Sequence, residues 1–439
     1  MTTRAHQPGA TTTASSALTP KTVWSAVLLL AAVLFAGGII RTVFSPLQEA
    51  AKLDLKLSDF DISLVQGIAA GVPIALVSVP LAWVIDHGNR TRLLVALLGI
   101  CVAGTFWTAF ADGLTPLFLA RMLAAVGAGC ALPVIISLVA DLCTPDHRGR
   151  AIVVLALGSV AGTAAAFVLG GLLLSQLASH PSALLGAMAP WRGTHLLLGA
   201  AGTLLLFPLL FLREPPRHEV ELQTTSLRLT SQALWAKRAF LIPLFIGQIG
   251  VSMADAAASI WATPVLVRNY HLQPAQFAGW LGAIVLVAGV LASVLGGFGA
   301  DLGHKTGRRG GLLFTAVVAT FVGIPAALFP VMPSVGGFQL AFFCLLLAGT
   351  TVSVVASTAV AVLIPNEERG ACMAAFSVIG SIVGAGLAPT IVTVGSTLMG
   401  GEQHLARSLA VTGVVTGVVS FAGYVLAMRN APKSATEWR

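Results

Sequence analysis

The stretch PLAWVIDHGNRTR (80–92) lies between two long apolar runs and changes within a few residues from acidic to basic. A related stretch, GGFGADLGHKTGRR (296–309), follows with its aspartate 215 residues further along the chain. The same offset aligns LKLSDFDISLV (55–65) with YHLQPAQFAGW (270–280). Repetition over this distance predicts that the chain consists of two related halves.

The composition places the chain in a membrane. Of its 439 residues, 56% are hydrophobic and only 10% are charged, and the mean hydropathy is +0.90. Soluble globular domains carry about 25% charged residues, so the composition argues against a soluble enzyme, a disordered chain or a disulfide scaffold. The net charge of +8 is spread along the chain without a basic stripe, which argues against nucleic acid as a partner. The sequence predicts an all-α membrane protein with many spans.

The hydropathy profile contains twelve apolar runs, each long enough to form a membrane-spanning helix. The charged stretch 213–238 divides them into six and six. The predicted spans are 22–46, 62–85, 93–111, 116–142, 151–176, 194–212, 239–267, 277–299, 311–330, 337–363, 371–398 and 406–428.

The basic residues predict the orientation. With the N-terminus inside, the cytoplasmic segments hold 18 Lys and Arg and the outer segments hold five, as expected because cytoplasmic loops collect these residues. Both termini are therefore expected to be cytoplasmic. The excess of Arg over Lys is typical of a GC-rich bacterial genome, and the expected location is a bacterial inner membrane. The expected organisation is a disordered tail (1–21), an N-terminal six-helix bundle (22–212), a cytoplasmic linker (213–238), a C-terminal six-helix bundle (239–428) and a second cytoplasmic tail (429–439).

Several motifs resemble the major facilitator superfamily and, within it, the Spinster-like group. The residues Ala82-x-x-x-Asp86-His87-x-Asn89-Arg90-x-Arg92 are similar to the superfamily's loop motif between helices two and three, with Ala82 in place of Gly and His87 in place of a basic residue. The resemblance implies two pseudo-symmetric bundles that work by alternating access around a site between them. The Spinster-like segments are QEAAKLDLKLSD (48–59), DHGNRTRLL (86–94), FLARM (118–122), PDHRGRA (145–151), FLREPPR (211–217) and IWATPVLVRNYHL (260–272).

The resemblance also implies that charged loop residues act in gating. Asp86 is expected to end helix two near the start of helix eleven, and Asp301 to end helix eight near the start of helix five, where a helix dipole stabilises a carboxylate. Such contacts would hold the cytoplasmic side shut in the outward-open state; ordinary surface pairing is the alternative, and for Arg121 the alternative is snorkelling to the interface. The residues predicted to take part are Asp86, Arg90, Asp301, Arg148, Arg369 and Arg121.

Two carboxylates expected from the resemblance are missing. Proteins of this kind usually have an Asp directly before the Arg of helix one, where this chain has Ile40 before Arg41. They also tend to have a Glu in the middle of helix four, which aligns with Ala128. The resemblance places proton coupling at these two acids, so coupling by that route is not expected.

Asp255 is the one acid predicted to lie far inside a span, about 22 Å along its helix at 1.5 Å per residue. A carboxylate at that depth costs about 2.5–3.5 kcal/mol unless it faces a cavity or a partner. The repeat maps Ile40 onto Asp255, so Arg41 is expected at nearly the same depth in the other half. The repeat thus predicts that the second half carries the acid that the first half lacks.

Two interpretations of Arg41 and Asp255 remain open. The pair either holds helices one and seven together or forms a substrate or coupling site, and an ionisable group inside a transporter favours the second. In that case an anionic substrate that binds Arg41 releases Asp255 to take up a proton; both interpretations hold if the pair breaks on binding. Further residues expected at the site are Gln248, Ser252 and Ser259 on the helix of Asp255, with Gln66, Ser353 and Ser357, although packing or bonding within one helix would also explain the last three.

These patterns predict a secondary transporter, not an enzyme, and the resemblance implies that its substrate is a small amphipathic or lipid-like solute. The alternative within transport is a small organic anion carrier or facilitator centred on Arg41; a non-transporting receptor or scaffold on the same fold is the alternative of another class. No cofactor, metal or nucleotide is expected, because the five cysteines lack CxxC spacing and GHKTG (303–307) lacks the Gly-Lys pair of a phosphate loop. The expected partners are the substrate, protons and membrane lipids, and the chain is expected to be a monomer.

The orientation can be tested in intact cells. With both termini and the 213–238 segment in the cytoplasm, a Ser226→Cys variant should not react with a membrane-impermeant thiol reagent until the cells are opened. Ready labelling of intact cells would contradict the orientation.

Overall fold

The computed structural model describes residues 20–180, 188–217 and 227–438. Within these residues the chain forms helices and connections without a β-strand, as expected where lipid offers the backbone no hydrogen bonds. The described residues contain twelve helical segments that are long and apolar enough to cross a membrane, one for each predicted run. Residues 1–19 of the predicted N-terminal tail and residues 218–226 of the predicted linker lie outside the described residues, whereas Pro20 and Lys21, predicted to be disordered, begin the first helix.

Six of the spans belong to the first half of the chain. Several are interrupted, so that one span comprises two or three consecutive helices. The elements are α1 (Pro20–Thr42), α2 (Phe44–Leu55), α3 (Asp59–Ser63), the π-helix η1 (Leu64–Ile68), α4 (Ala69–His87), α5 (Arg90–Phe110), α6 (Leu114–Gly129), α7 (Ala131–Leu142), α8 (Pro145–Ser179) and α9 (Pro190–Leu210).

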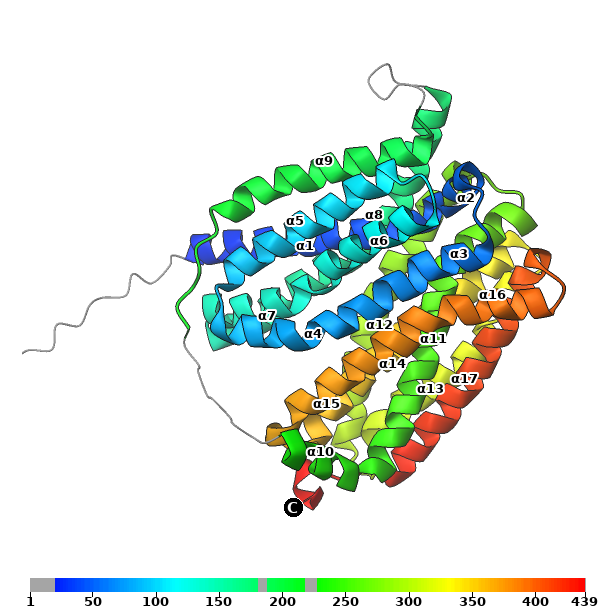
Figure 1. Cartoon of the computed structure of the whole chain (residues 1–439). Coiled ribbons are helices and arrows are strands. Elements are labelled where there is room, and N and C mark those ends of the chain that lie inside the picture. Colours follow the sequence, from blue (N-terminus) through cyan, green and yellow to red (C-terminus); the bar gives the residue numbers. More distant parts are fainter. Residues whose placement is uncertain (1–19, 181–187, 218–226, 439) are drawn as a thin grey trace, which may run out of the picture.

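The other six spans follow a short helix, α10 (Leu227–Ala236), in the predicted linker. Figure 1 shows the two halves side by side, the first in blue to green and the second in green to red. The elements are α11 (Arg238–Asn269), α12 (Pro274–Lys305), η2 (Gly311–Leu313), α13 (Phe314–Ala326), η3 (Phe329–Val331), α14 (Val335–Leu363), α15 (Asn366–Ile379), the π-helix η4 (Gly380–Leu387), α16 (Ala388–Leu398), η5 (Glu402–His404), α17 (Leu405–Asn430) and η6 (Ala435–Trp438).

The first span breaks between α1 and α2, at Val43. Pro46 explains the break because it has no N–H to donate to the carbonyl of Thr42, and its ring crowds the preceding turn. The break lies inside the membrane and frees the last carbonyls of α1 for other donors. A hydropathy profile cannot show it, because the profile averages over side chains and does not report where a backbone hydrogen bond is lost.

The two π-helices lie against each other where the halves meet. A Cβ atom added to Gly67 of η1 would lie 2.4 Å from the carbonyl oxygen of Gly386, so only glycine permits this approach. One turn further, the Ser381 hydroxyl donates to the carbonyl of Gly71 at 3.0 Å. Because a π-helix leaves the regular hydrogen-bond ladder, the paired segments form a backbone-to-backbone contact between the halves near the middle of the membrane.

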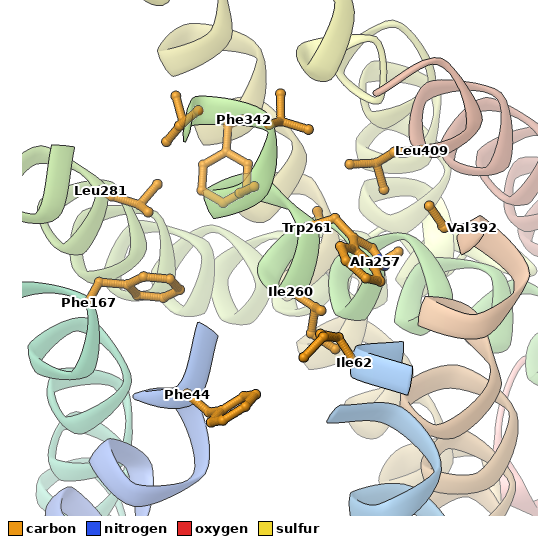
Figure 2. Packing of buried hydrophobic residues seen from close by; sticks show 14 of the residues in the cluster. Phe44, Ile62, Phe167, Ala257, Ile260, Trp261, Leu281, Phe342, Val392 and Leu409 are labelled. Atoms are coloured by element: carbon orange, nitrogen blue, oxygen red, sulfur yellow. The ribbon is translucent and has the colours of Figure 1, made fainter. Parts of the chain in front are cut away.

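The hydrophobic core is shared at only one end of the molecule. We call this end the closed face; it holds the connections 56–58 and 270–273, and the opposite end, with α10, is the linker face. One cluster at the closed face combines residues of both halves, among them Phe44 and Phe167 from the first and Trp261 from the second (Figure 2). Away from the closed face the core separates into clusters that each lie within a single half. The halves are therefore packed together at the closed face.

An ion network seals the closed face. Arg268 at the end of α11 contacts Glu49 of α2 at 2.6 Å and Asp59 of α3 at 2.6 Å, so it joins the second half to the first. The Asp59 side chain is only 2% exposed and also accepts a hydrogen bond from Lys52 at 2.6 Å. From the second half, Glu402 pairs with Lys52 and accepts the Asp59 N–H at 2.7 Å. Removing one partner of such a buried pair costs about 3–5 kcal/mol, because the other charge stays buried.

We expect Asp59→Asn to open the closed face, because it leaves Arg268 without one of its two carboxylates. In a background with the native cysteines replaced by serine, a cysteine at Ile62 reports on the closed face, since Ile62 lies in the shared core with 1% exposure. The alkylation rate of this cysteine should rise at least tenfold with Asp59→Asn. A tenfold rise corresponds to a loss of about 1.4 kcal/mol in the free energy that favours the closed face.

Asp61→Asn serves as the matched control. Among the described residues its carboxylate bonds only to Ser58 of its own turn, so the substitution removes the same charge without removing a contact to the opposite half. Equal alkylation rates in the Asp59 and Asp61 variants would show that the ion network does not hold this face closed.

Candidate functional site

Arg41 lies at the end of α1, in the middle of the first span, and its side chain is exposed. The residues one turn away on the same helical face, Gly37, Gly38, Phe44 and Ser45, are all buried. The exposed surface of Arg41 therefore lies inside the protein and not against lipid. Its guanidinium has neither a hydrogen bond nor an ion pair to any residue that the structure describes. A charged group with this placement, inside the protein and unpaired among the described residues, is available to an anion.

Arg121 of α6 holds the helix break beside Arg41. It is 5% exposed and donates to the carbonyls of Ile40 at 3.1 Å and Arg41 at 2.9 Å, and its guanidinium carbon lies 5.1 Å from the centre of the Phe44 ring. The alternative of a side chain that snorkels to the interface is wrong, because Arg121 is buried. The structure places it as the group that binds the free carbonyls at the end of α1 and so fixes the position of Arg41.

Gln66, predicted at the site, belongs to a polar network that crosses between the halves. Its amide donates to Gln48, and its oxygen accepts from the Ser45 hydroxyl at 3.3 Å. Gln48 in turn donates to the backbone carbonyl of Ile260 in α11 at 2.6 Å. Gln66 thus contributes to closure on the closed-face side of Arg41.

The predicted polar stripe on α11 faces the interior of the second half, as expected from its helical spacing. Gln248 is buried and donates to Ser353 at 3.0 Å and to Ser252 at 3.3 Å. It accepts a hydrogen bond of 2.8 Å from Tyr424 of α17, which is fully buried. Sequence reasoning missed Tyr424, although a lone tyrosine within an apolar run is a signal for a buried hydrogen bond.

The remaining hydroxyl groups contribute less to this network. Ser357 donates to the carbonyl of Ser353, one turn earlier on its own helix, at 2.9 Å. Ser259 is partly exposed and makes no hydrogen bond to a residue that the structure describes. A role for either in substrate binding stays a prediction.

Asp255 does not pair with Arg41 in this conformation, so the direct ion pair expected from the repeat is not formed among the described residues. Its carboxylate points to α14, where a Cβ atom added to Gly349 would lie 2.1 Å from Oδ2. The repeat predicted similar depths for the two residues but could not give the direction of the Asp255 side chain, which faces the interior of the second half. The Oδ1 atom is buried and has no hydrogen-bond partner in the described structure.

Asp86 and Asp301 lie where the sequence predicted, at the linker-face ends of α4 and α12, and both are exposed. Neither carboxylate bonds to a described residue in this conformation. Arg148 and Arg369 each donate to a backbone carbonyl close by in sequence, those of Cys143 and Ile364, at 3.3 Å. Because the expected contacts belong to the opposite conformation, gating by these groups stays a prediction.

Arg90 has a different arrangement, with contacts to the first half and to the start of the predicted linker. It is buried, pairs with Asp141 of α7, and contacts Glu214 at 2.8 Å. Partial burial raises the pKa of Glu214, but hydrogen bonds from Arg90 and Thr91 outweigh this effect and hold that pKa below its usual value. Arg217 donates to the carbonyl of Ile85 at 2.8 Å, so the segment after α9 binds both the end of α4 and the start of α5. Arg90 therefore fixes the loop that carries Asp86.

The chain matches the model of the Major Facilitator Superfamily over residues 28–389. It is 25% identical to an MFS-type efflux pump of Mycolicibacterium smegmatis, with 89% of each chain covered. It is 26% identical to a probable 4-methylmuconolactone transporter of Cupriavidus pinatubonensis, with 75% of each covered. It is 27% identical to the 3-(3-hydroxy-phenyl)propionate transporter of Escherichia coli, covering 59% of this chain and 62% of the relative.

Solved structures share the same fold. The crystal structure of a bacterial homologue of the human lysosomal transporter Spinster, in an inward-facing and unoccupied conformation, superposes with a TM-score of 0.81 at 22% identity, covering 94% of this chain and 98% of that one. The occupied inward-facing form of such a homologue gives a TM-score of 0.78. The fold expected from the Spinster-like motifs is confirmed. With a family match over most of its length and this two-half, twelve-span fold, the chain belongs to the Major Facilitator Superfamily of secondary transporters.

Proposed function

We propose that this transporter moves a small amphipathic solute with an anionic group, and that Arg41 binds the anion. The observation that carries the proposal is an exposed guanidinium inside the protein with no partner among the described residues. An arginine is suited to a carboxylate because its planar donors bind both oxygens. One relative is named as a transporter of 3-(3-hydroxy-phenyl)propionate, a carboxylate with an aromatic ring, which supports this class.

The transport cycle follows from the packing of the halves. In the conformation described, the halves share a core and an ion network at the closed face, and they have separate cores at the linker face. If the linker face is cytoplasmic, as the basic residues predict, the solute reaches Arg41 from the cytoplasm. The halves then rock about their contact so that the closed-face pairs separate and contacts at Asp86 and Asp301 form. A substrate drives this exchange only to the extent that it binds one conformation more tightly than the other.

A facilitator of small organic anions is the second candidate, since it needs the same Arg41 and no coupled ion. A measurement of transport against a concentration gradient distinguishes the two, because a coupled transporter can perform it and a facilitator cannot. A receptor or scaffold on this fold is distinguished more simply, because it would bind ligand without moving it across a proteoliposome membrane. The M. smegmatis relative is named as an efflux pump, which supports movement out of the cell.

Binding of matched ligands to purified protein tests the role of Arg41. A panel of aromatic monocarboxylates is compared with the corresponding uncharged amides by thermal shift and equilibrium binding. Loss of charge-assisted hydrogen bonds costs about 1.5–3 kcal/mol, so Arg41→Ala should weaken carboxylate binding by roughly 10-fold to 150-fold and leave amide binding unchanged. Arg41→Lys should retain part of the preference, because it keeps the charge but not the planar donors.

Arg407→Ala is the matched control, since it removes an exposed arginine near the closed face. It should bind the panel as the wild type does. If Arg41→Ala keeps the wild-type preference for carboxylates over amides, Arg41 is not the anion-binding group.

A further inference from the structure

Asp255 faces a small cavity inside the second half. The cavity has a volume of about 20 Å³ and is bounded by α11, α13, α14 and α17. Its wall includes Gly349, whose missing side chain leaves room for the carboxylate, together with Thr320 and Ser420. Asp255 is the only titratable residue in this wall, and every wall residue belongs to the described structure.

The charge of the carboxylate has no counterion in the protein. No Lys, Arg or His among the described residues lies within the 4.0 Å that defines an ion pair with Asp255, and its Oδ1 atom is buried without a hydrogen bond. A bare carboxylate at this depth is costly, because neither lipid nor apolar side chains solvate it. The cost is removed if a cation binds the carboxylate.

The hydroxyl groups of the wall can act toward an occupant only as acceptors. Thr320 donates its proton to the carbonyls of Ala316 and Val317, both at 2.9 Å. Ser420 donates to the carbonyl of Gly247 at 2.7 Å. Each hydroxyl oxygen keeps its lone pairs, so the polar lining offers oxygen acceptors and no free donor. Such a lining favours a cation over an anion.

The size of the cavity restricts the occupant. A volume of about 10–15 Å³ accommodates one water molecule, so about 20 Å³ admits a single particle of that size. An organic substrate does not fit. A proton on the carboxylate or one sodium ion does.

We propose that this cavity is the site of a single monovalent cation, a proton or a sodium ion, held by the Asp255 carboxylate. This inference rests on the proposed secondary transport, for which it supplies the coupled ion. The site is separate from Arg41, so the cation and the organic anion are bound at the same time by different groups. This arrangement replaces the direct exchange at an Arg41–Asp255 pair.

The helix α11 connects the cation site to the closure of the protein. Five residues beyond Asp255, the carbonyl of Ile260 accepts a hydrogen bond from Gln48 of the first half. At the end of the same helix, Arg268 pairs with Glu49 and Asp59. A cation that changes the packing of α11 against α14 therefore acts on the contacts that hold the closed face together, which is the physical requirement for coupling.

The site is tested by thermal unfolding of the purified protein without any substrate. One arm adds sodium at constant ionic strength and constant high pH, with choline as the balancing cation; the other lowers the pH without sodium. A cation that binds only the folded protein stabilises it by mass action, so the wild type should show a saturable rise in Tm of a few degrees in one arm. The arm that responds identifies sodium or the proton.

Asp255→Asn should abolish that response, because the amide neither binds a proton nor supplies a charge. Gly349→Ala keeps the carboxylate but places a methyl group where Oδ2 lies, so it should raise the cation concentration for half-maximal stabilisation at least tenfold. The control is Asp112→Asn, which removes an exposed acid in the first half and should keep the full response.

The proposal is overturned if the wild type responds to neither cation, or if Asp255→Asn retains the wild-type response. Because the measurement contains no organic anion, its outcome is independent of ligand binding at Arg41. Failure of the cation site and failure of the proposed substrate class are therefore distinguished.

Discussion

The buried carboxylate of Asp59 is the constraint on which this conformation depends. It is 2% exposed and binds Arg268 of the opposite half together with Lys52 of its own, so the two halves can part at this face only if these charges are solvated at the same time. Breaking such a cluster without water costs several kcal/mol, whereas in an opened, hydrated face the same charges lose much less. The network thus stabilises the conformation in which this face is closed, and it can separate when the face opens and water solvates the charges.

Between the ion network and the linker face, the two halves meet at the contact of η1 and η4, which must also move when the closed face opens. Gly67 of η1 and Gly71 of α4 bring their backbones directly against the backbone of η4. Toward the linker face each half has its own hydrophobic core. The halves can therefore tilt relative to each other without separating core residues that pack together. Arg41 lies next to the break in the first span, fixed by Arg121, where a change in tilt changes its access. The charged groups, the helix breaks and the divided core therefore all fit one movement, a rocking of the two halves about their contact.

Much of this fold is predictable from the sequence for physical reasons. The twelve spans follow from the length of each apolar run, and the two halves follow from the repeat around Asp86 and Asp301. The direction of Asp255 was beyond prediction, because helical spacing identifies a polar face but not the helix opposite it, and the gap at Gly349 is visible only in three dimensions. The closed-face network was missed because its members are up to 350 residues apart in sequence, although Asp59 and Arg268 both lie in segments that carry the family resemblance.

Alternating access is tested most directly by measuring distances across both faces of one protein. Spin labels at Lys56 and Gln403 span the closed face, and labels at His147 and Lys305 span the linker face; all four side chains are exposed, and each pair joins the two halves. A bound solute or loss of the Asp59 carboxylate should lengthen the distance across the closed face. The account predicts that the distance across the linker face then becomes shorter. If the two distances change in the same direction, or the closed face widens while the linker face stays unchanged, the halves do not rock about their contact and the account is contradicted.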